Sequence, residues 1–246
     1  MDKNLSAARY YHWPEYPAGA YALGACQGLL RRLLSGWPRR SRSVLTMGAG
    51  SCALVETLWD AGFDVTAQDS DQDFLDKARD LLGNRADFVL SAPDHLPFDD
   101  DSFDYAVAAL ALEFWEQPRA VLEEMGRLAT GGVIILFPNA WSVFGLECLV
   151  RRKAMLCTSA RPLLRSPQQV ANLARTVFGP KARAWASVLP LCSATWRRGA
   201  LFRRLNSLYA PLPLGAFAAL RVDFGPLYSG TPLLLRRNEP VAPAKP

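Results

Sequence analysis

Two glycines and an aspartate are the residues whose types and spacing best support chemistry. Gly48 and Gly50 stand in the segment VLTMGAGSCA, directly after an expected strand and before an expected helix. Missing side chains there let a ligand approach the backbone and the helix N-terminus. Asp69 ends the next expected strand, 21 residues after Gly48, where a carboxylate can accept hydrogen bonds from both ribose hydroxyls. Together these residues predict a nucleotide-type cofactor.

Each feature alone also has a structural explanation. A glycine pair after a strand often makes only a tight turn, and an aspartate that closes a strand often caps a helix. The segment GAGSCA also satisfies the dinucleotide fingerprint, with Ala53 in the third position. The glycine loop by itself therefore does not decide which cofactor binds.

The elements that must position these residues alternate between strand and helix patterns. Expected strands lie at 43–47, 63–69, 86–90, 102–110 and 131–138, and helical patterns at 72–82 and 117–129. Beyond 138 we expect a helix at 166–178, a strand at 182–189, a Pro-rich loop at 209–215 and a last strand at 231–237. The pattern predicts an α/β fold of the Rossmann-like, doubly wound kind, with a mostly parallel seven-stranded sheet.

The chain divides by composition and rhythm into four parts of one expected domain. Residues 1–42 read as an N-terminal helical cap or lid, 43–138 as the cofactor-binding core, and 139–237 as a substrate cap inserted with the last strands. Residues 238–246 read as a disordered Pro-rich tail.

Several motifs together resemble a known enzyme family. The segment from Ser43 to Ser142 contains SVLTMGAGS, VTAQDSDQDFLDKAR, FVLSAPDHLPFDDDSFDYAVAALALEFW and EEMGRLATGGVIILFPN. It resembles the class I, S-adenosylmethionine-dependent methyltransferases of the UbiE-like, or methyltransferase type 11, family. The Leu-Pro-Phe, the acidic turn before Ser102 and the Glu-Met-x-Arg-Leu before a glycine pair carry the resemblance.

The resemblance implies a set of S-adenosylmethionine contacts at the ends of successive strands. The loop of Met47, Gly48, Ala49 and Gly50 would face the methionyl part. The other expected contacts are Asp69 and Ser70 for the ribose, Asp94, His95 and Leu96 for the adenine, and Ala109 and Leu110 near the sulfonium.

The sequence departs from the family pattern at four matched positions. Thr46 replaces a common acid, Cys52 replaces a glycine, and Ala92 and Pro93 stand where a carboxylate and an N–H are usual. These departures leave open a non-catalytic module that binds the cofactor or a membrane. A third alternative is an NAD-dependent oxidoreductase, which the absence of a Tyr-x-x-x-Lys pair disfavours.

The expected reaction is methyl transfer to an unidentified small-molecule or lipid-like acceptor. No catalytic residue is identified. Glu113, just past the fourth strand, is a candidate for positioning a substrate or acting as a base, with exposure to solvent as the alternative. Candidate substrate contacts are Tyr11, Tyr21, Asn139, Trp141 and Tyr209. With His12 and His95 as the only histidines, we expect no metal site.

Charge is unevenly distributed along the chain. Residues 1–147 hold 21 of the 23 acids, whereas residues 148–221 hold 13 Lys or Arg and no acid. An Arg-rich, apolar segment suits an anionic substrate or peripheral contact with an anionic membrane; nucleic acid is less favoured. Five scattered cysteines and no secretory signal predict free thiols in a cytoplasmic protein, with peripheral contact at the inner face of a membrane as an open alternative.

Overall fold

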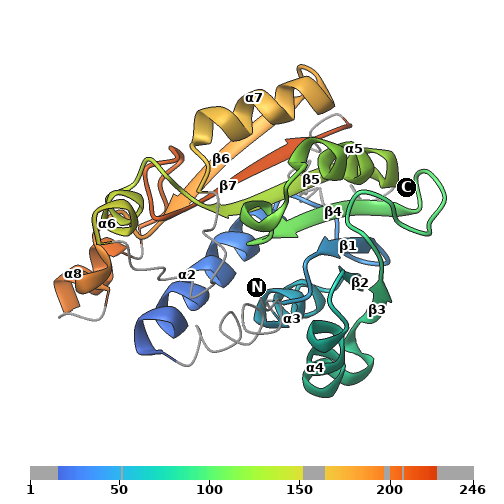
Figure 1. Ribbon diagram of the computed structural model, residues 1–246, viewed down its shortest axis with the longest axis horizontal. Coiled ribbons are helices and arrows are strands. Elements are labelled where there is room, and N and C mark those ends of the chain that lie inside the picture. The colour runs from blue at the N-terminus through green and yellow to red at the C-terminus, as the bar shows by residue number, and fades with distance from the viewer. Residues whose placement is uncertain (1–15, 51, 152–163, 197–199, 207, 226–246) are drawn as a thin grey trace, which may run out of the picture.

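A single seven-stranded sheet organises the molecule in the computed structural model, which describes residues 16–50, 52–151, 164–196, 200–206 and 208–225 (Figure 1). The strand order is β3-β2-β1-β4-β5-β7-β6. The strands are β1 (Ser43–Met47), β2 (Asp64–Asp69), β3 (Asp87–Leu90), β4 (Phe103–Ala109), β5 (Ala129–Pro138), β6 (Ala182–Val188) and β7 (Phe217–Asp223). Six of the seven strands run in one direction, and β7 runs in the opposite direction between β5 and β6. The expected mostly parallel, seven-stranded fold is confirmed.

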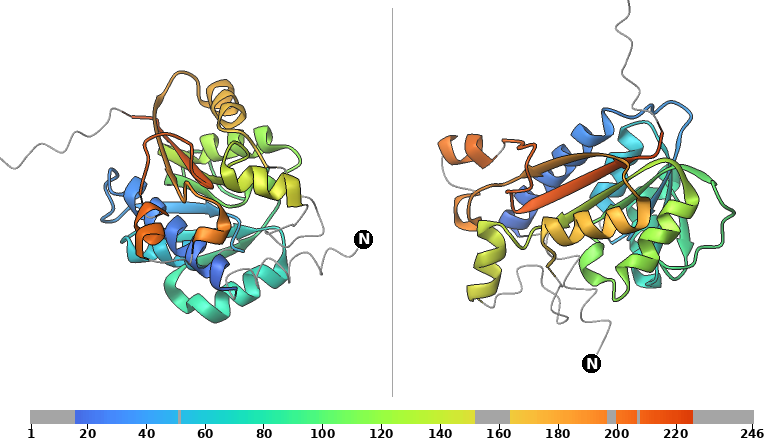
Figure 2. Two further views of the ribbon diagram at one scale, coloured as in Figure 1. Left: turned by 90° about the vertical axis from the view of Figure 1, so that its left-hand side faces the viewer. Right: turned by 90° about the horizontal axis from the view of Figure 1, so that it is seen from above.

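Helices cover both faces of the sheet (Figures 1 and 2). One face packs against α2 (Pro17–Leu34), α3 (Cys52–Asp60) and α4 (Gln72–Leu82), and the other against α5 (Pro118–Leu128) and α7 (Pro167–Phe178). The central strands are therefore buried on both sides, and β5 is apolar from Val133 onward because both of its faces are buried there. Two further helices, α6 (Val143–Arg151) and α8 (Ala200–Asn206), lie together at one end of the sheet.

Local sequence signals set the helix ends. The Asp71 side chain accepts a hydrogen bond from the Asp73 backbone N–H and begins α4, which ends at Gly83. Ser166 and Gln169 form a reciprocal capping box at the start of α7. Short 3₁₀ turns at Gly83–Arg85, Leu112–Phe114 and Ser193–Thr195 complete the regular structure of the described residues.

The last strands differ in one respect from expectation. The strand expected at 182–189 is confirmed as β6, whereas β7 at Phe217–Asp223 was not expected, because no element was predicted between the loop at 209–215 and the strand at 231–237. The strand expected at 231–237 lies outside the described residues, as does the tail at 238–246. β7 fills the place between β5 and β6, so the residues beyond 138 extend the same sheet.

The amino ends of the parallel strands are closed by a polar cluster. Trp37 donates its indole N–H to a carboxylate oxygen of Asp223 at 2.7 Å, and Arg221 donates to both oxygens of the same carboxylate. Arg221 also donates to the carbonyl of Leu33, at the end of α2, while the Trp37 ring stacks on Tyr105 with centroids 4.0 Å apart. These contacts fasten α2 to β7 and β4.

Candidate cofactor site

The glycine loop follows β1 at the carboxyl edge of the sheet. The backbone N–H groups of Gly48 and Ala49 both donate to the carbonyl of Gln68, at 2.9 and 3.1 Å. Gly48 has φ +89°, and a Cβ there would stand 2.8 Å from the Cβ of Ala111. Glycine is therefore required twice over, by the backbone conformation and by the approach of the segment that follows β4.

Asp69 joins the glycine loop to the end of β2. One carboxylate oxygen accepts from the N–H of Gly50 at 3.3 Å, and the other accepts from the N–H of Asp71 at 3.1 Å. Burial raises the pKa of the Asp69 carboxyl, and the N–H groups of Asp71, Ser70 and Gly50 oppose that rise. The two motifs that predicted a nucleotide site thus lie in direct contact.

The loop after β3 lies beside this pair. The N–H of Ser91 donates to the carbonyl of Asp69 at 3.1 Å, and the side chain of Gln68 donates to the carbonyl of Ser91 at 2.6 Å. The hydroxyl of Ser91 is buried and has no hydrogen-bond partner among the described residues. Asp94 and His95 are exposed, whereas Leu96 is buried.

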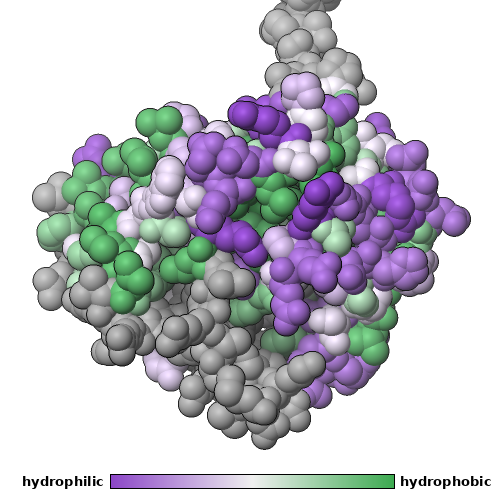
Figure 3. Space-filling view, turned by 45° about the horizontal axis from the view of Figure 1, so that its top comes forward, coloured by the Kyte–Doolittle hydropathy of each residue, from purple (hydrophilic) through white to green (hydrophobic). Residues whose placement is uncertain are grey.

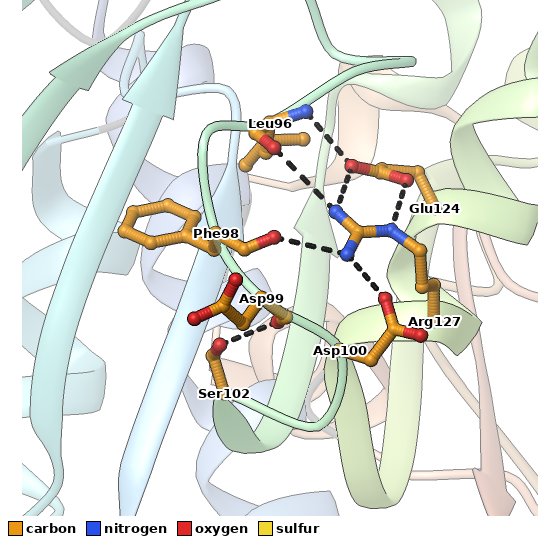
Figure 4. A network of polar contacts seen from close by, with 7 residues as sticks. All are labelled: Leu96, Phe98, Asp99, Asp100, Ser102, Glu124 and Arg127. Carbon is orange, nitrogen blue, oxygen red and sulfur yellow. Dashed lines mark hydrogen bonds and ion pairs between the residues drawn. The ribbon is translucent and has the colours of Figure 1, made fainter.

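A carboxylate and a guanidinium from α5 hold this loop in place (Figure 4). Glu124 accepts from the N–H of Leu96 at 2.8 Å, and Arg127 donates to both oxygens of Glu124 at 2.7 and 2.8 Å. Arg127 also donates to the carbonyl of Phe98 at 2.9 Å and to Asp100 at 2.6 Å. The Glu-x-x-Arg spacing puts both side chains on one turn of the helix, facing the loop.

This clamp gives a physical reason for two motifs that the sequence analysis used only as signs of resemblance. Glu124 and Arg127 belong to the Glu-Met-x-Arg-Leu segment, and their partners belong to the Leu-Pro-Phe segment and the acidic turn after it. The acidic residues 99–101 are exposed, as expected of a solvated turn, but Asp100 also pairs with Arg127.

The segment after β4 turns sharply beneath the glycine loop. Ala109 and Leu110 are buried, and Leu110 has φ +56° with its N–H donated to the carbonyl of Leu136 at 2.9 Å. Three residues later Glu113 is 3% exposed, so the alternative that it faces solvent is wrong. Neither of its carboxylate oxygens has a hydrogen-bond partner in the described part of the chain. Burial raises the pKa of Glu113 to about 8.

The charges of Glu113 and Arg165 interact, as do Glu113 and the buried Cys26, and sequence reasoning missed Arg165 and Cys26 as parts of a site. The charge of Arg165 lowers the pKa of Glu113. Desolvation raises the pKa of the buried Cys26 thiol, and the charge of Glu113 raises it further. Arg165 donates weakly to the carbonyl of Trp115 at 3.5 Å, while its Nε finds no partner among the described residues. No local pattern marks Arg165, because it reaches the site through a long-range bridge beside Asn139.

The expected substrate contacts fall in different places. Asn139 is fully buried: its amide donates to the carbonyls of Pro213 and Gly215 and accepts from the N–H of Trp141, so it holds the loop after β5. Trp141 is 65% exposed. Tyr21 is half-buried on α2, and Tyr209 lies against the same helix with Arg32 over its ring. Tyr11 lies outside the described residues.

These groups fit an adenosyl cofactor. A glycine cradle that a Cβ would fill, the Asp69 carboxylate and the buried hydroxyl of Ser91 lie at the ends of three adjacent strands. Open α/β sheets bind their ligands at this edge. Cys52 packs its thiol near the carbonyl of Ala49, 3.7 Å away, so its side chain lies behind the loop.

Residues 45–137 match the family model described as Methyltransferase domain. These residues, less than half of the chain, are therefore similar to a methyltransferase domain. The resemblance stated from the sequence is thereby confirmed, and the matched region runs from β1 to β5, the part of the sheet that bears the glycine loop, Asp69 and Glu113. These comparisons give no support to the oxidoreductase alternative.

Two kinds of curated relatives are similar to this methyltransferase domain. An uncharacterized methyltransferase of Mycobacterium tuberculosis is 34% identical over 102 residues, which is 42% of each chain. A demethylmenaquinone methyltransferase of Paenarthrobacter aurescens is 30% identical over 155 residues, covering 58% of this chain and 56% of that protein. The match thus spans only about half of the length of these relatives, or less.

Solved structures share the fold over a longer span. A methyltransferase of Thermotoga maritima, described as a possible histamine N-methyltransferase, superposes with a TM-score of 0.66 at 17% identity, covering 89% of this chain and 95% of that one. The magnesium protoporphyrin IX methyltransferase of Synechocystis, solved with S-adenosylhomocysteine, gives 0.55 at 15% identity, with 84% of each chain covered. At these identities the likeness establishes the fold alone.

Two searches of the described residues bear on membranes and metals. No described helix is both long and apolar enough to cross a membrane. Within the same residues, no three His, Cys, Asp or Glu side chains gather in a group that could hold a metal ion.

Proposed function

We propose that the protein transfers a methyl group from S-adenosylmethionine to a small-molecule acceptor at the carboxyl edge of the sheet. The observation that carries the proposal is the cradle formed by Gly48, Gly50 and Asp69 within a methyltransferase domain. Unpartnered buried polar atoms of Ser91 and Glu113 at the same edge support it, because such atoms are costly unless a ligand or water satisfies them.

Different loops at the carboxyl edge would bind different parts of S-adenosylmethionine. The segment from Met47 to Gly50 would contact the methionyl part, Asp69 and Ser70 the ribose, and Asp94 to Leu96 the adenine, with Glu124 and Arg127 holding that last loop. Ala109 and Leu110 would lie near the reacting centre. When bound, the sulfonium supplies an already activated methyl group, so the protein chiefly aligns the acceptor and excludes water.

Glu113 and Arg165 are proposed to orient the acceptor. A carboxyl with a pKa of about 8 is mostly protonated at neutral pH, so Glu113 can donate a hydrogen bond to an acceptor oxygen or nitrogen in a buried place. Arg165 remains cationic beside it and favours an acceptor with partial or full negative charge, such as a phenolate or a carboxylate. Glu113 is therefore a positioning group first, and a base only when ionised.

A ring-containing, lipid-like acceptor is the class that the surroundings favour. The exposed Trp141 and the half-buried Tyr21 offer apolar ring surface at the same edge. Among the similar proteins are two described as demethylmenaquinone methyltransferases, which supports a quinone-like acceptor here. Peripheral contact with a membrane, where such acceptors dissolve, belongs to the same proposal.

The test is transfer of tritiated methyl from S-adenosylmethionine to a reduced demethylmenaquinone with a short side chain. Label that passes into organic solvent with the wild-type protein, and falls at least about tenfold in Glu113→Leu with unchanged cofactor affinity, supports the proposal, because leucine can neither donate nor accept a hydrogen bond. Cofactor binding without transfer to this or other quinol acceptors favours the non-catalytic module instead. Absence of both binding and transfer contradicts the proposal.

A further inference from the structure

Exposed apolar side chains gather at the end of the molecule where α6 and α8 lie. Of 15 large hydrophobic side chains that are exposed among the described residues, 10 belong to α6, α8 and the loops beside them. They are Trp141, Val143, Leu146, Leu149, Phe202, Leu205, Leu208, Tyr209, Leu212 and Leu214. Figure 3 shows hydrophobic colour concentrated on this left-hand side, while the opposite side is hydrophilic. Clusters of this kind on a water-facing surface usually mark an interaction site.

Helix α6 is apolar on two faces. Phe144 is 1% exposed and packs into the core, where its ring lies 5.3 Å from that of Trp196. Val143, Leu146 and Leu149 repeat every three residues and are 51%, 59% and 76% exposed. A helix that needs only one apolar face to pack has here a second apolar stripe directed at solvent.

The second part of the surface is firmly attached to the fold, which argues against a loosely packed end. Asn206 of α8 is buried, accepts from the N–H of Leu191 at 3.4 Å and donates to the hydroxyl of Thr195 at 3.2 Å. Glu147 of α6 accepts from the N–H of Ser193 at 3.0 Å and so ties the two parts together. The exposed Phe202 and Leu205 stand three residues apart on the helix held in this way.

Charge indicates what this surface contacts. From Cys148 to Arg221 the sequence has 13 Lys or Arg and no acid, and three of these bases, at 151–153, directly follow the stripe of α6. Glu147, the one acid of α6, is half-buried, and its carboxylate accepts a hydrogen bond from the backbone N–H of Ser193. Of the described residues, Arg151 ends α6, the exposed Arg204 lies on α8 and Arg32 stands over the ring of Tyr209. Apolar side chains with bases beside them complement an anionic lipid surface, where the apolar groups enter the acyl boundary and the bases meet phosphates.

We propose that α6, α8 and residues 208–214 form a docking surface for an anionic lipid bilayer. The surface lies at the carboxyl edge of the sheet, because α6 follows the end of β5 and residues 208–214 precede β7, which starts opposite Pro138. Docking there would bring the proposed acceptor site to the membrane, a role that rests on the proposed function. The docking itself depends only on the surface.

The experiment measures co-sedimentation of the full chain with vesicles of phosphatidylcholine, alone or with a third of phosphatidylglycerol. The wild type should bind the anionic vesicles, and more weakly as salt rises. Leu146→Ser/Leu149→Ser should lower the partition coefficient at least about tenfold. The matched control is Leu81→Ser on α4, because Leu81 is 67% exposed but lies away from the surface; it should bind like wild type.

Three outcomes would overturn the docking surface. They are absence of wild-type binding to anionic vesicles, an equal loss in Leu81→Ser, and a concentration-dependent dimer that only the double variant abolishes, which would make a second copy the occupant. Affinity for S-adenosylhomocysteine, measured on the same variants, separates the two proposals. Vesicle binding that persists without any cofactor affinity overturns the proposed function and leaves the surface standing.

Discussion

The two edges of the parallel sheet differ in how fully their buried polar groups are hydrogen-bonded. At the amino edge, Asp223 is bonded to Trp37 and Arg221, and Asp104 to Arg42 and Ser43. At the carboxyl edge lie five of the six buried side-chain polar atoms that lack a partner among the described residues. These are Thr46 Oγ1, Ser91 Oγ, both carboxylate oxygens of Glu113 and Arg165 Nε.

The difference separates groups that stabilise the fold from groups available to a ligand. Both edges belong to one sheet and bury similar chemistry, so burial alone does not explain why the amino edge leaves only Arg183 Nε without a partner among the described residues, whereas the carboxyl edge leaves five such atoms. Buried polar groups in native proteins are almost always bonded, and exceptions concentrate at functional sites. The contrast thus favours the carboxyl edge as the active one.

Replacing the least satisfied group should produce the largest effect. The Glu113 pKa is raised to about 8, so between its unfolded value and about 8 the folded protein holds a proton that the unfolded chain releases. Wild-type stability should therefore fall as pH rises through this window. Glu113→Gln, which cannot ionise, should escape the fall and exceed the wild type by about 4 kcal/mol near pH 8.

The measurement is the free energy of unfolding in urea for both proteins from mildly acidic to mildly alkaline pH. The two proteins should have equal stability at acidic pH, where the wild-type carboxyl is protonated in both states. Parallel pH profiles would show that Glu113 is solvated or paired in solution and would remove the main contrast between the edges.

Breaking the clamp on the third loop should have the next largest effect. Arg127→Ala leaves the mostly buried Glu124 carboxylate without its cation and frees Leu96 and Phe98, so we expect a loss of about 2 kcal/mol in unfolding free energy. Affinity for S-adenosylhomocysteine should fall as well. Arg119→Ala on the same helix, which removes an exposed pair with Glu123, is the control and should cost less than about 0.5 kcal/mol.

The smallest effect is expected at the amino edge. Trp37→Phe removes the indole N–H bonded to Asp223, while Arg221 still holds that carboxylate, so the cost should be about 1 kcal/mol. Cofactor affinity should stay at the wild-type value, because this cluster lies at the other end of the strands. A decrease in affinity as large as that of Arg127→Ala would mean that the edges are coupled.

Much of the cofactor half could be predicted because its signals are local. Strand-turn-helix patterns placed Gly48 and Asp69 at the ends of successive strands, and short-range capping gave the start of α4 at Asp71. The second half depends on long-range pairing. β7 was missed because it is buried on both faces, so its residues do not alternate, and it is recognisable only once β5 and β6 stand on either side.

The same limit applies within the site. Glu113 could be placed after β4 from the sequence, but its burial could not, because the residues that interact with it, Cys26 and Arg165, come from distant parts of the chain. Asn139 was expected at the substrate, whereas its amide is used to hold the loops at Trp141 and Pro213. A side chain's partners across 50 or more residues leave no periodic trace in a sequence.

Calorimetric titration with S-adenosylhomocysteine tests the central claim most directly. Wild type should bind, Trp37→Phe should bind equally, and Asp69→Asn should bind at least about tenfold more weakly, because a charged acceptor of two ribose hydroxyls becomes a neutral amide. NADH should give no heat of binding. A wild-type protein that binds no S-adenosylhomocysteine, or an Asp69→Asn variant that binds as tightly as wild type, would contradict the assignment of the carboxyl edge.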